Sequence, residues 1–508
     1  MIKFKKFTAL LSAFALSVLP VFAFAGCSKE DETVTLRVSN WEEYIDLGGW
    51  SDDELIDIEN PYGEDGAGIF GKNSMVDDFT EWFNSTHDFN VKVEYSTFGT
   101  NEDLYNRISL GDVYDLVCPS DYMLMKLIAE GACEEYSEQF LNEGEYAENV
   151  SPYIDGVFES YDWNKYAACY MWGTTGIVYN PDKVDDIADV SSWNILLNEK
   201  YKRMVTIKDN VRDAYFATLG VINSEKLREG TLSAEQRSAL LNDVEGTTIA
   251  AAEDVLKRIK DNVYSFETDA GKLDMVTGKV IANYQWSGDS VFIMDEAESD
   301  ESNPTELWYS VPDECTNLWF DGWVMLKKGI EGSERKRTAA EAFVNFLSRP
   351  DNAVRNMYYI GYTSAIAGET VLDYINWNYG AEEDVQDVYA YDVSYFFGGE
   401  AAVEADASGF GFDGEDRTSV NRGRQLFAQY PSENVIERSV VMLDFGDKLG
   451  EINQMWINVR CLDVKDISPV TVGIVAAVVV VIAVAVCLYV FRYRIFVYRP
   501  KKGYKRVN

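Results

Sequence analysis

Short apolar runs alternate with amphipathic segments from residue 33 onward, and this alternation constrains the fold more than any other feature of the chain. Before residue 130 it predicts strands at 34–39, 91–95 and 115–119, and helices at 75–83, 104–110 and 122–130. After residue 170 it returns, with strands at 176–179, 204–207 and 280–284 and helices at 214–219 and 251–259. Such spacing favours a largely parallel sheet covered by helices. The sequence therefore predicts an α/β fold built as two lobes.

Three acidic, glycine-rich stretches interrupt this pattern, at residues 46–73, 295–304 and 398–424. Their composition is typical of surface loops. The piece at 409–416 carries several acids, but their spacing does not match a calcium-binding loop. We therefore expect a solvated loop there, and no metal site.

The chain is strongly acidic, with a formal net charge of −40. The acid lies between residues 27 and 469, because the first 26 residues and residues 470–508 carry Lys and Arg but no Asp or Glu. A surface of this sign repels DNA and RNA, so no nucleic-acid partner is expected. A cationic or neutral partner is favoured instead.

The chain lacks the residues that most kinds of enzymatic catalysis require. The single histidine, His87, lies in a polar turn, and no phosphate-binding glycine loop follows a strand. We therefore expect neither an enzyme nor a cofactor. A pair of carboxylates for glycoside hydrolysis is the one enzymatic arrangement that the composition leaves open.

The N-terminus has the anatomy of an export signal. Three lysines precede an apolar run at residues 7–24, and Ala25-Gly26-Cys27 follows at the point where cleavage is expected. This pattern resembles a bacterial lipobox, which predicts a lipoprotein signal peptide at residues 1–26 and lipidation of Cys27. Ordinary cleavage nearby, with Cys27 unmodified, is the alternative; either way the mature chain leaves the cytoplasm.

A second apolar segment lies near the C-terminus. Residues 470–490 carry no charge, and at about 1.5 Å per residue they can cross a hydrocarbon core about 30 Å thick. The tail at 491–508 is rich in Lys and Arg, which predicts a cytoplasmic location for it. The sequence thus predicts a transmembrane helix that holds residues 28–469 outside the cell membrane. A buried core helix is the alternative.

Five short motifs place aromatic residues or acids just after predicted strands, where α/β folds form ligand sites. They are Asn40-Trp41-Glu42-Glu43-Tyr44, Pro119-Ser120-Asp121-Tyr122, the run from Lys208 to Asp213, Trp286-Ser287-Gly288-Asp289, and Trp319-Phe320-Asp321-Gly322-Trp323. Aromatic faces attract cations and pack against methylene chains, while carboxylates bind ammonium groups. Together they favour a flexible, multiply charged alkylamine. Each motif alone is compatible with core aromatics beside solvated acids.

At these residues the chain resembles the spermidine/putrescine-binding proteins of polyamine ABC importers, over roughly residues 33–365. Trp41 and Tyr44 resemble the family's first aromatic pair, and Ser120 and Tyr122 match its Pro-Ser-x-Tyr turn. The segment at 170–175 is similar to the family's passage into the second lobe. Further matches are the cleft tryptophan at Trp286, the Trp-x-Asp motif at Trp319 and Asp321, and the Gly-Tyr-Thr turn at Tyr362.

This resemblance implies a bilobal, periplasmic-binding-protein-like fold that closes about a hinge, with lobe 1 at residues 33–168 and 319–365 and lobe 2 at 169–318 and 366–460. It implies that Asp321 binds an amine, that Trp319 and Trp286 stack on methylenes, and that Asp213 holds an ammonium group. Asn210 stands where the family can have an Asp, Glu42 replaces a small polar residue, and Asp121 adds an acid.

The implied partners are a polyamine, an ABC permease with its ATPase, and the membrane that holds both anchors. Two alternatives stay open from the sequence. The same scaffold could bind another small solute, or the chain could be a surface carbohydrate-active enzyme.

Overall fold

The computed structural model describes residues 33–300, 303–412 and 419–461, together with residues 414 and 417 and a few positions between 477 and 486. The predicted signal peptide, Cys27, the basic tail and most of the predicted span at 470–490 lie outside these residues. Within the part of the chain that is described, no helix combines the length and apolar character needed to cross a membrane.

The first α/β unit is built on β1 (Val34–Trp41), which lies between β2 (Val91–Phe98) and β3 (Leu116–Val117) and is parallel to both. Helix α1 (Met75–Thr86) begins at Ser74, whose side chain accepts a hydrogen bond from the Asp77 amide. The predicted strands and helices of this region are confirmed within a few residues. The other elements are α2 (Asn101–Leu110), α3 (Asp121–Ala129), β4 (Cys133–Glu134), α4 (Glu138–Asn142), α5 (Glu145–Asn149), α6 (Pro152–Ser160), α14 (Lys327–Ile330), α15 (Glu334–Leu347) and α16 (Pro350–Ile360).

The second α/β unit repeats this plan with β6 (Val205–Lys208) between β7 (Ser265–Glu267) and β8 (Ala282–Trp286), again in parallel. Its core is separate from that of the first unit. Its helices are α7 (Ile187–Val190), η2 (Trp193–Leu197), η3 (Glu199–Tyr201), α8 (Val211–Ile222), α9 (Ser224–Arg228), α10 (Ala234–Leu241), α11 (Gly246–Asn262), η5 (Gly446–Lys448) and α21 (Leu449–Arg460).

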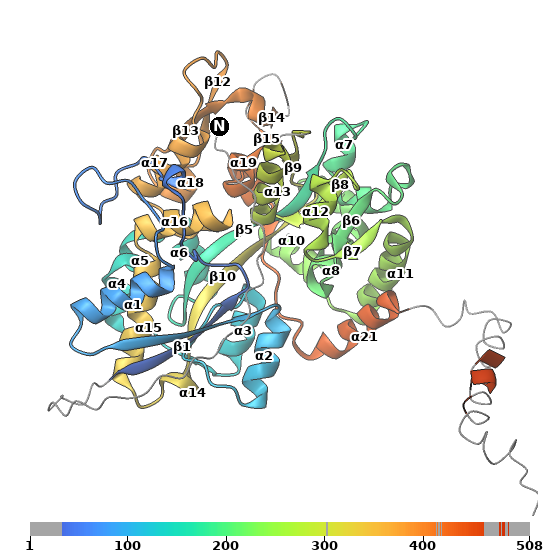
Figure 1. The fold of residues 1–508 in the computed structure, drawn as a ribbon. Coiled ribbons are helices and arrows are strands. Elements are labelled where there is room, and N and C mark those ends of the chain that lie inside the picture. Colours follow the sequence, from blue (N-terminus) through green and yellow to red (C-terminus); the bar gives the residue numbers. More distant parts are fainter. Residues whose placement is uncertain are drawn as a thin grey trace, which may run out of the picture.

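Two long strands, β5 (Ala167–Tyr179) and β10 (Thr316–Leu326), run from one unit into the other (Figure 1). Both are buried along their whole length and pair in antiparallel fashion. The expectation of a largely parallel sheet is therefore correct only inside each unit. Shorter elements flank these strands: α12 (Ala270–Val276), α13 (Ser287–Ser299), β9 (Trp308–Ser310), β11 (Thr363–Ser364) and β16 (Ser439–Val440).

Residues 366–436 form a further group of elements beside α16 and α6 (Figure 1). The expected loop at 398–424 is wrong in part, because alternating burial of Val403 and Ala405 stabilises a hairpin of β12 with β13. The group comprises α17 (Glu369–Tyr379), β12 (Val388–Asp392), α18 (Ser394–Phe397), β13 (Ala402–Asp406), η4 (Ala407–Gly409), β14 (Phe410–Phe412), β15 (Val420–Gly423), α19 (Gln425–Gln429) and α20 (Glu433–Ile436). The assignment of residues 366–460 to the second lobe stays a prediction.

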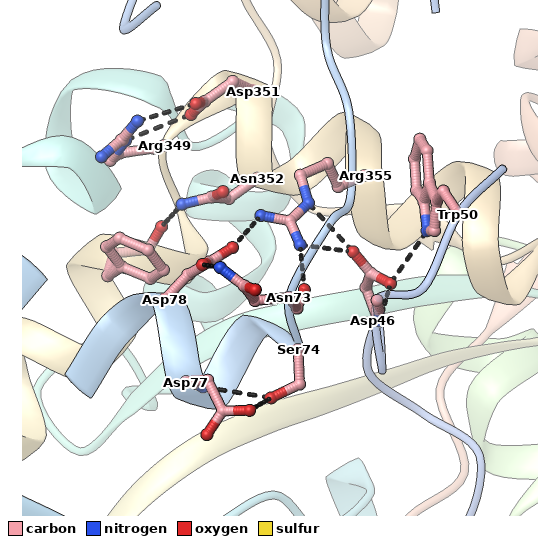
Figure 2. Close-up of polar contacts among 12 residues, drawn as sticks. Asp46, Trp50, Asn73, Ser74, Asp77, Asp78, Arg349, Asp351, Asn352 and Arg355 are labelled. Carbon is pink, nitrogen blue, oxygen red and sulfur yellow. Dashed lines mark hydrogen bonds and ion pairs between the residues drawn. The ribbon is translucent and has the colours of Figure 1, made fainter. Parts of the chain in front are cut away.

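The acidic stretch at 46–73 is a surface loop as expected, with only the short η1 (Asp52–Glu54), yet a buried ion pair anchors it. Arg355 on α16 donates from Nε and Nη2 to one oxygen of Asp46, at 2.9 and 2.6 Å, and from Nη1 to Asp78 at 2.8 Å (Figure 2). The Trp50 indole donates to the other oxygen of Asp46. The loop is thus fixed to α1 and α16 immediately after the Trp41–Tyr44 motif.

We predict that Arg355→Met lowers the free energy of unfolding by about 3 kcal/mol, because Asp46 then remains buried without its charge partner. Arg37→Met, which removes the half-exposed pair with Glu94, is the matched control and should cost less than about 1 kcal/mol. Urea unfolding followed by circular dichroism measures both variants. Equal losses in the two would contradict the anchoring role.

Candidate functional site

The carboxylate of Asp321 lies at the centre of β10, where a register shift between Asp321 and Gly322 interrupts the pairing with β5. Its Oδ1 accepts a hydrogen bond from the Ser120 hydroxyl at 2.6 Å, and its Oδ2 accepts one from the Tyr44 hydroxyl at 2.8 Å. Among the described residues, no Lys or Arg forms an ion pair with it. Burial raises the pKa of Asp321 to about 6, although both hydroxyl donors lower it. A buried, ionised carboxylate with only neutral partners is unstable, and a bound cation would stabilise it.

Aromatic rings surround this carboxylate. The Tyr44 ring lies edge-on to Tyr170 and Tyr362, with centroids 5.7 and 5.1 Å away, and Tyr362 lies 5.7 Å from Trp319. The Trp319 indole donates to the Thr174 carbonyl at 3.1 Å, which fixes its orientation. Tyr44 follows β1, Tyr170 and Trp319 lie within β5 and β10, and Tyr362 lies in the turn before β11. They form an apolar wall suited to methylene groups.

Two glycines permit this close packing. A Cβ at Gly173 would overlap Ser287 and Trp319, and a Cβ at Gly288 would overlap the Tyr362 ring. The rings therefore reach their positions because β5 and α13 carry no side chain at these two points.

Asp121 supports Asp321 from α3. Its carboxylate accepts hydrogen bonds from the Phe320 amide at 3.2 Å and from the Tyr122 amide at 2.6 Å. Burial raises the pKa of Asp121 to about 8, and the charge of Asp321 adds to this shift. With a proton on Asp121 at neutral pH, the site does not contain a second buried negative charge. The role of Asp121 is then to hold the backbone beside Asp321 through its two hydrogen bonds.

Tyr122 joins the two units. The guanidinium of Arg212 lies 3.8 Å from the Tyr122 ring centroid and 4.0 Å from that of Phe445, and it donates to the Leu443 carbonyl and to Asp444. This stack fixes α8 of the second unit against α3 of the first.

A second polar cluster forms at the ends of β6 and β8. Tyr362 donates to Asp289 at 3.0 Å, and Lys272 donates to the same oxygen at 3.1 Å. Burial raises the pKa of Asp213 to about 6, while Lys208 and a hydrogen bond with Trp286 lower it. Tyr362 contacts Asp289 through its hydroxyl and Tyr44 through its ring, so it connects this cluster to the group around Asp321.

Three predicted residues lie outside these two hydrogen-bonded groups. Trp41 is half-buried against Phe98, with ring centroids 4.8 Å apart, and Glu42 is exposed. Asn210 caps α8 by accepting a hydrogen bond from the Arg212 amide at 2.8 Å. The other predicted residues meet in or beside the two groups: Tyr44, Ser120, Asp121, Tyr122, Asp213, Trp286, Trp319, Asp321 and Tyr362.

The sequence motifs contained Asp289 and Lys208, but neither was named as a binding residue; the structure adds both to the cluster. The signal for Asp289 was available, because it follows Trp286 by three residues and lies in the first turn of α13. Lys208 carried no such signal, since a lysine at a strand end is usually solvated.

Comparison with known proteins agrees with this architecture. The model of the bacterial extracellular solute-binding protein family matches residues 74–371. The putrescine-binding periplasmic protein PotF of Escherichia coli is 26% identical, over 72% of this chain and 86% of its own. The spermidine/putrescine-binding periplasmic protein of the same organism is also 26% identical, over 67% of this chain and 81% of its own.

Two solved structures share the fold. The substrate-binding protein of a spermidine/putrescine ABC transporter from Streptococcus pneumoniae has a TM-score of 0.53 at 23% identity, and a putative spermidine/putrescine ABC transporter from Listeria monocytogenes has 0.56 at 22%. Each comparison covers 84% of this chain and 98% of the other. They confirm the expected bilobal α/β fold, and we now call the two units lobes.

Family membership carries two consequences. The family binds solutes outside the cell, so the described lobes are extracytoplasmic and the protein is a binding protein rather than an enzyme, as the sequence predicted. Because the match spans more than half of the chain, this protein belongs to the bacterial extracellular solute-binding protein family.

Proposed function

We propose that this protein binds a polyamine of the putrescine and spermidine class and delivers it to the permease and ATPase of an ABC importer. The observation that carries the proposal is Asp321, a buried carboxylate with neutral partners inside an aromatic wall. The names of the relatives point to the same ligand class.

The chemistry of Asp321 suits an ammonium group. Each carboxylate oxygen already accepts one hydroxyl hydrogen bond and keeps capacity for a second donor. An ammonium group supplies up to three donors and a positive charge, which offsets the cost of burying the carboxylate. The methylenes of the ligand then pack on Trp319, Tyr44 and Tyr362, where cation and aromatic ring also attract one another. An anionic solute would instead meet a like charge.

The proposed binding residues come from both lobes; nine of them meet in or beside the two hydrogen-bonded groups, and Trp41, Glu42 and Asn210 lie outside these groups. Asp321, Tyr44, Ser120, Trp319 and Tyr362 have the strongest support from the geometry. The full proposed set is Trp41, Glu42, Tyr44, Ser120, Asp121, Tyr122, Asn210, Asp213, Trp286, Trp319, Asp321 and Tyr362.

Hinge motion about the two crossing strands explains how a ligand reaches this buried site. Contacts between the Tyr122 ring and Arg212 join the lobes, which supports a closed form as the state that the structure describes. Bending of β5 and β10 would separate lobe 1, at residues 33–168 and 319–365, from lobe 2, at 169–318 and 366–460. The permease then receives the closed, loaded protein.

We further propose that the protein is held at the cell membrane at both ends. The lipobox-like Ala25-Gly26-Cys27 supports lipidation of Cys27 after removal of residues 1–26, and the uncharged run at 470–490 supports a membrane span. The basic tail at 491–508 then lies in the cytoplasm. Two anchors would keep the lobes beside the permease.

We predict that the full chain in detergent binds putrescine or spermidine, and that Asp321→Asn weakens the binding at least about a hundredfold, because a charged partner is replaced by a neutral one of equal size. Asp182→Asn makes the same charge change on the surface and should leave affinity unchanged. Isothermal titration measures all three proteins. Failure of the folded wild type to bind any amine would redirect the search to neutral and anionic solutes.

We predict that amine affinity rises with pH between 5 and 7. Burial holds the pKa of Asp321 and of Asp213 at about 6, so below this pH a ligand ammonium must displace a proton. Affinity at pH 5 should be at least about tenfold weaker than at pH 7, and binding near pH 6 should release protons. Titration in two buffers of different ionisation enthalpy measures that release.

The same shifts have a consequence for stability. Because the folded state holds these protons more tightly than the unfolded chain, their contribution to the stability of the ligand-free protein should fall as pH rises from about 4 to about 6. Asp321→Asn should reduce both the rise of amine affinity with pH and the fall of stability with pH. A pH-independent affinity would argue against Asp321 as the ammonium partner.

We predict that Cys27→Ser and deletion of residues 470–508 each leave the protein in the membrane fraction, because either anchor suffices to hold it. Only the combined variant should be released into the medium or periplasm. Fractionation of cells that express the four forms measures this. Release by Cys27→Ser alone would contradict the second anchor.

A further inference from the structure

A lysine of the chain itself lies in the second polar cluster. Lys208 ends β6, and its side chain is completely buried. Its Nζ lies 3.9 Å from the centroid of the Trp286 ring and 3.8 Å from Oδ2 of Asp289, and it donates to the Thr268 carbonyl at 2.9 Å. Burying a lysine ammonium group costs free energy of folding, so we expect Lys208 to have a function in this position.

These partners are the ones that a ligand ammonium would need. An aromatic face, a carboxylate and a carbonyl oxygen together form a complete site for an alkylammonium group. The aliphatic stem of Lys208 carries such a group into the site from the strand end. The Lys208 side chain thus places the protein's own ammonium group in a position that could bind the ammonium group of a ligand.

The charges around Lys208 can be counted. Three carboxylates act on it, those of Asp289, Glu267 and Asp213, and Lys272 is the second cation beside Asp289. Arg212, which also acts on Asp213, is held by Asp444. Asp269 also pairs with Lys272 but is largely exposed. Three acids against two ammonium groups leave about one negative charge uncompensated at this end of the site.

The other end differs. Asp321 has hydroxyl partners and, among the described residues, no basic one. One ligand ammonium group is therefore required at Asp321. The one uncompensated negative charge at the Lys208 end can bind a second ligand ammonium group. A third ammonium would have to enter space that Lys208 and Lys272 already fill with positive charge.

We propose that Lys208 acts as a built-in ammonium group that fills the position between Trp286 and Asp289, and that this selects a diamine over a triamine as the ligand. The proposal rests on the polyamine-binding function proposed above and sharpens it to a putrescine-like substrate. Lys208 is in this account a specificity-determining residue.

Titration of Lys208→Met with putrescine and spermidine tests the proposal. Methionine keeps the length and apolar stem but removes the charge. Wild type should prefer putrescine, and the variant should shift the affinity ratio toward spermidine by at least about tenfold, because its third ammonium can now occupy the vacated position. Lys92→Met, which removes an exposed lysine, is the control and should leave the ratio unchanged.

The outcomes separate the two proposals. If wild type binds polyamines but prefers spermidine, or if Lys208→Met leaves the ratio unchanged, the role of Lys208 is overturned while the polyamine function stands. If folded wild type binds no polyamine, the proposed function itself fails, and with it the choice of a diamine.

A second experiment tests the position of Lys208 without relying on polyamines. Lys208→Ala leaves an aromatic and acidic site without its amine, and n-butylammonium should refill it and raise the melting temperature of this variant by several degrees, by mass action. Wild type and Lys92→Ala should show no such rise. No stabilisation of folded Lys208→Ala would overturn the proposal, and where alanine does not fold, the putrescine and spermidine titration of Lys208→Met decides it.

Discussion

The burial of Asp321 without a basic partner among the residues that the structure describes is the constraint on which the rest of the site depends. Its carboxylate is held by the Ser120 and Tyr44 hydroxyls, and burial raises its pKa to about 6. A charge in such a position costs stability until a cation reaches it, so the ligand-free protein carries an unfavourable term that binding removes. Neighbouring Asp121 avoids adding to this cost, because its pKa is raised to about 8.

The fold provides the place for that carboxylate. Strands β5 and β10 cross between the lobes, and Asp321 lies at the irregularity in their pairing. Glycines at 173 and 288 let Trp319 and Tyr362 approach from the two sides. On the first lobe, the Arg355–Asp46 ion pair fixes the loop that follows Tyr44 (Figure 2). Residues that are far apart in the sequence thus together shape the surroundings of the Asp321 carboxylate.

Much of this arrangement could be predicted from the sequence. Period and length identify the strands that end at Trp41 and Trp286, and ligand sites in α/β folds lie at such ends. Motif position brought Ser120 and Asp321 into consideration, and the family resemblance added Tyr362. The two crossing strands were harder to predict, because a strand buried on both faces shows no alternation. The hairpin inside 398–424 was missed because its glycines and acids outweighed the alternation around Val403.

Side-chain partners were the part that local pattern could not supply. Lys208 at a strand end and Arg355 on a helix look like ordinary solvated residues until the tertiary structure surrounds them with Asp289 and Asp46. Asn210 shows the opposite case, because the structure gives it a helix-capping role that its motif did not predict, beside the binding role proposed for it. Both pairs form within a single lobe between residues that are far apart along the chain, and no short window of sequence contains that information.

The most direct test of the central claim is a crystal structure of the protein with putrescine. The account predicts one ligand nitrogen within about 3 Å of the Asp321 carboxylate, with the methylenes against Trp319 and Tyr362 and with the Lys208 ammonium still on the face of Trp286. A ligand bound away from Asp321, or with both nitrogens distant from its carboxylate, would contradict it.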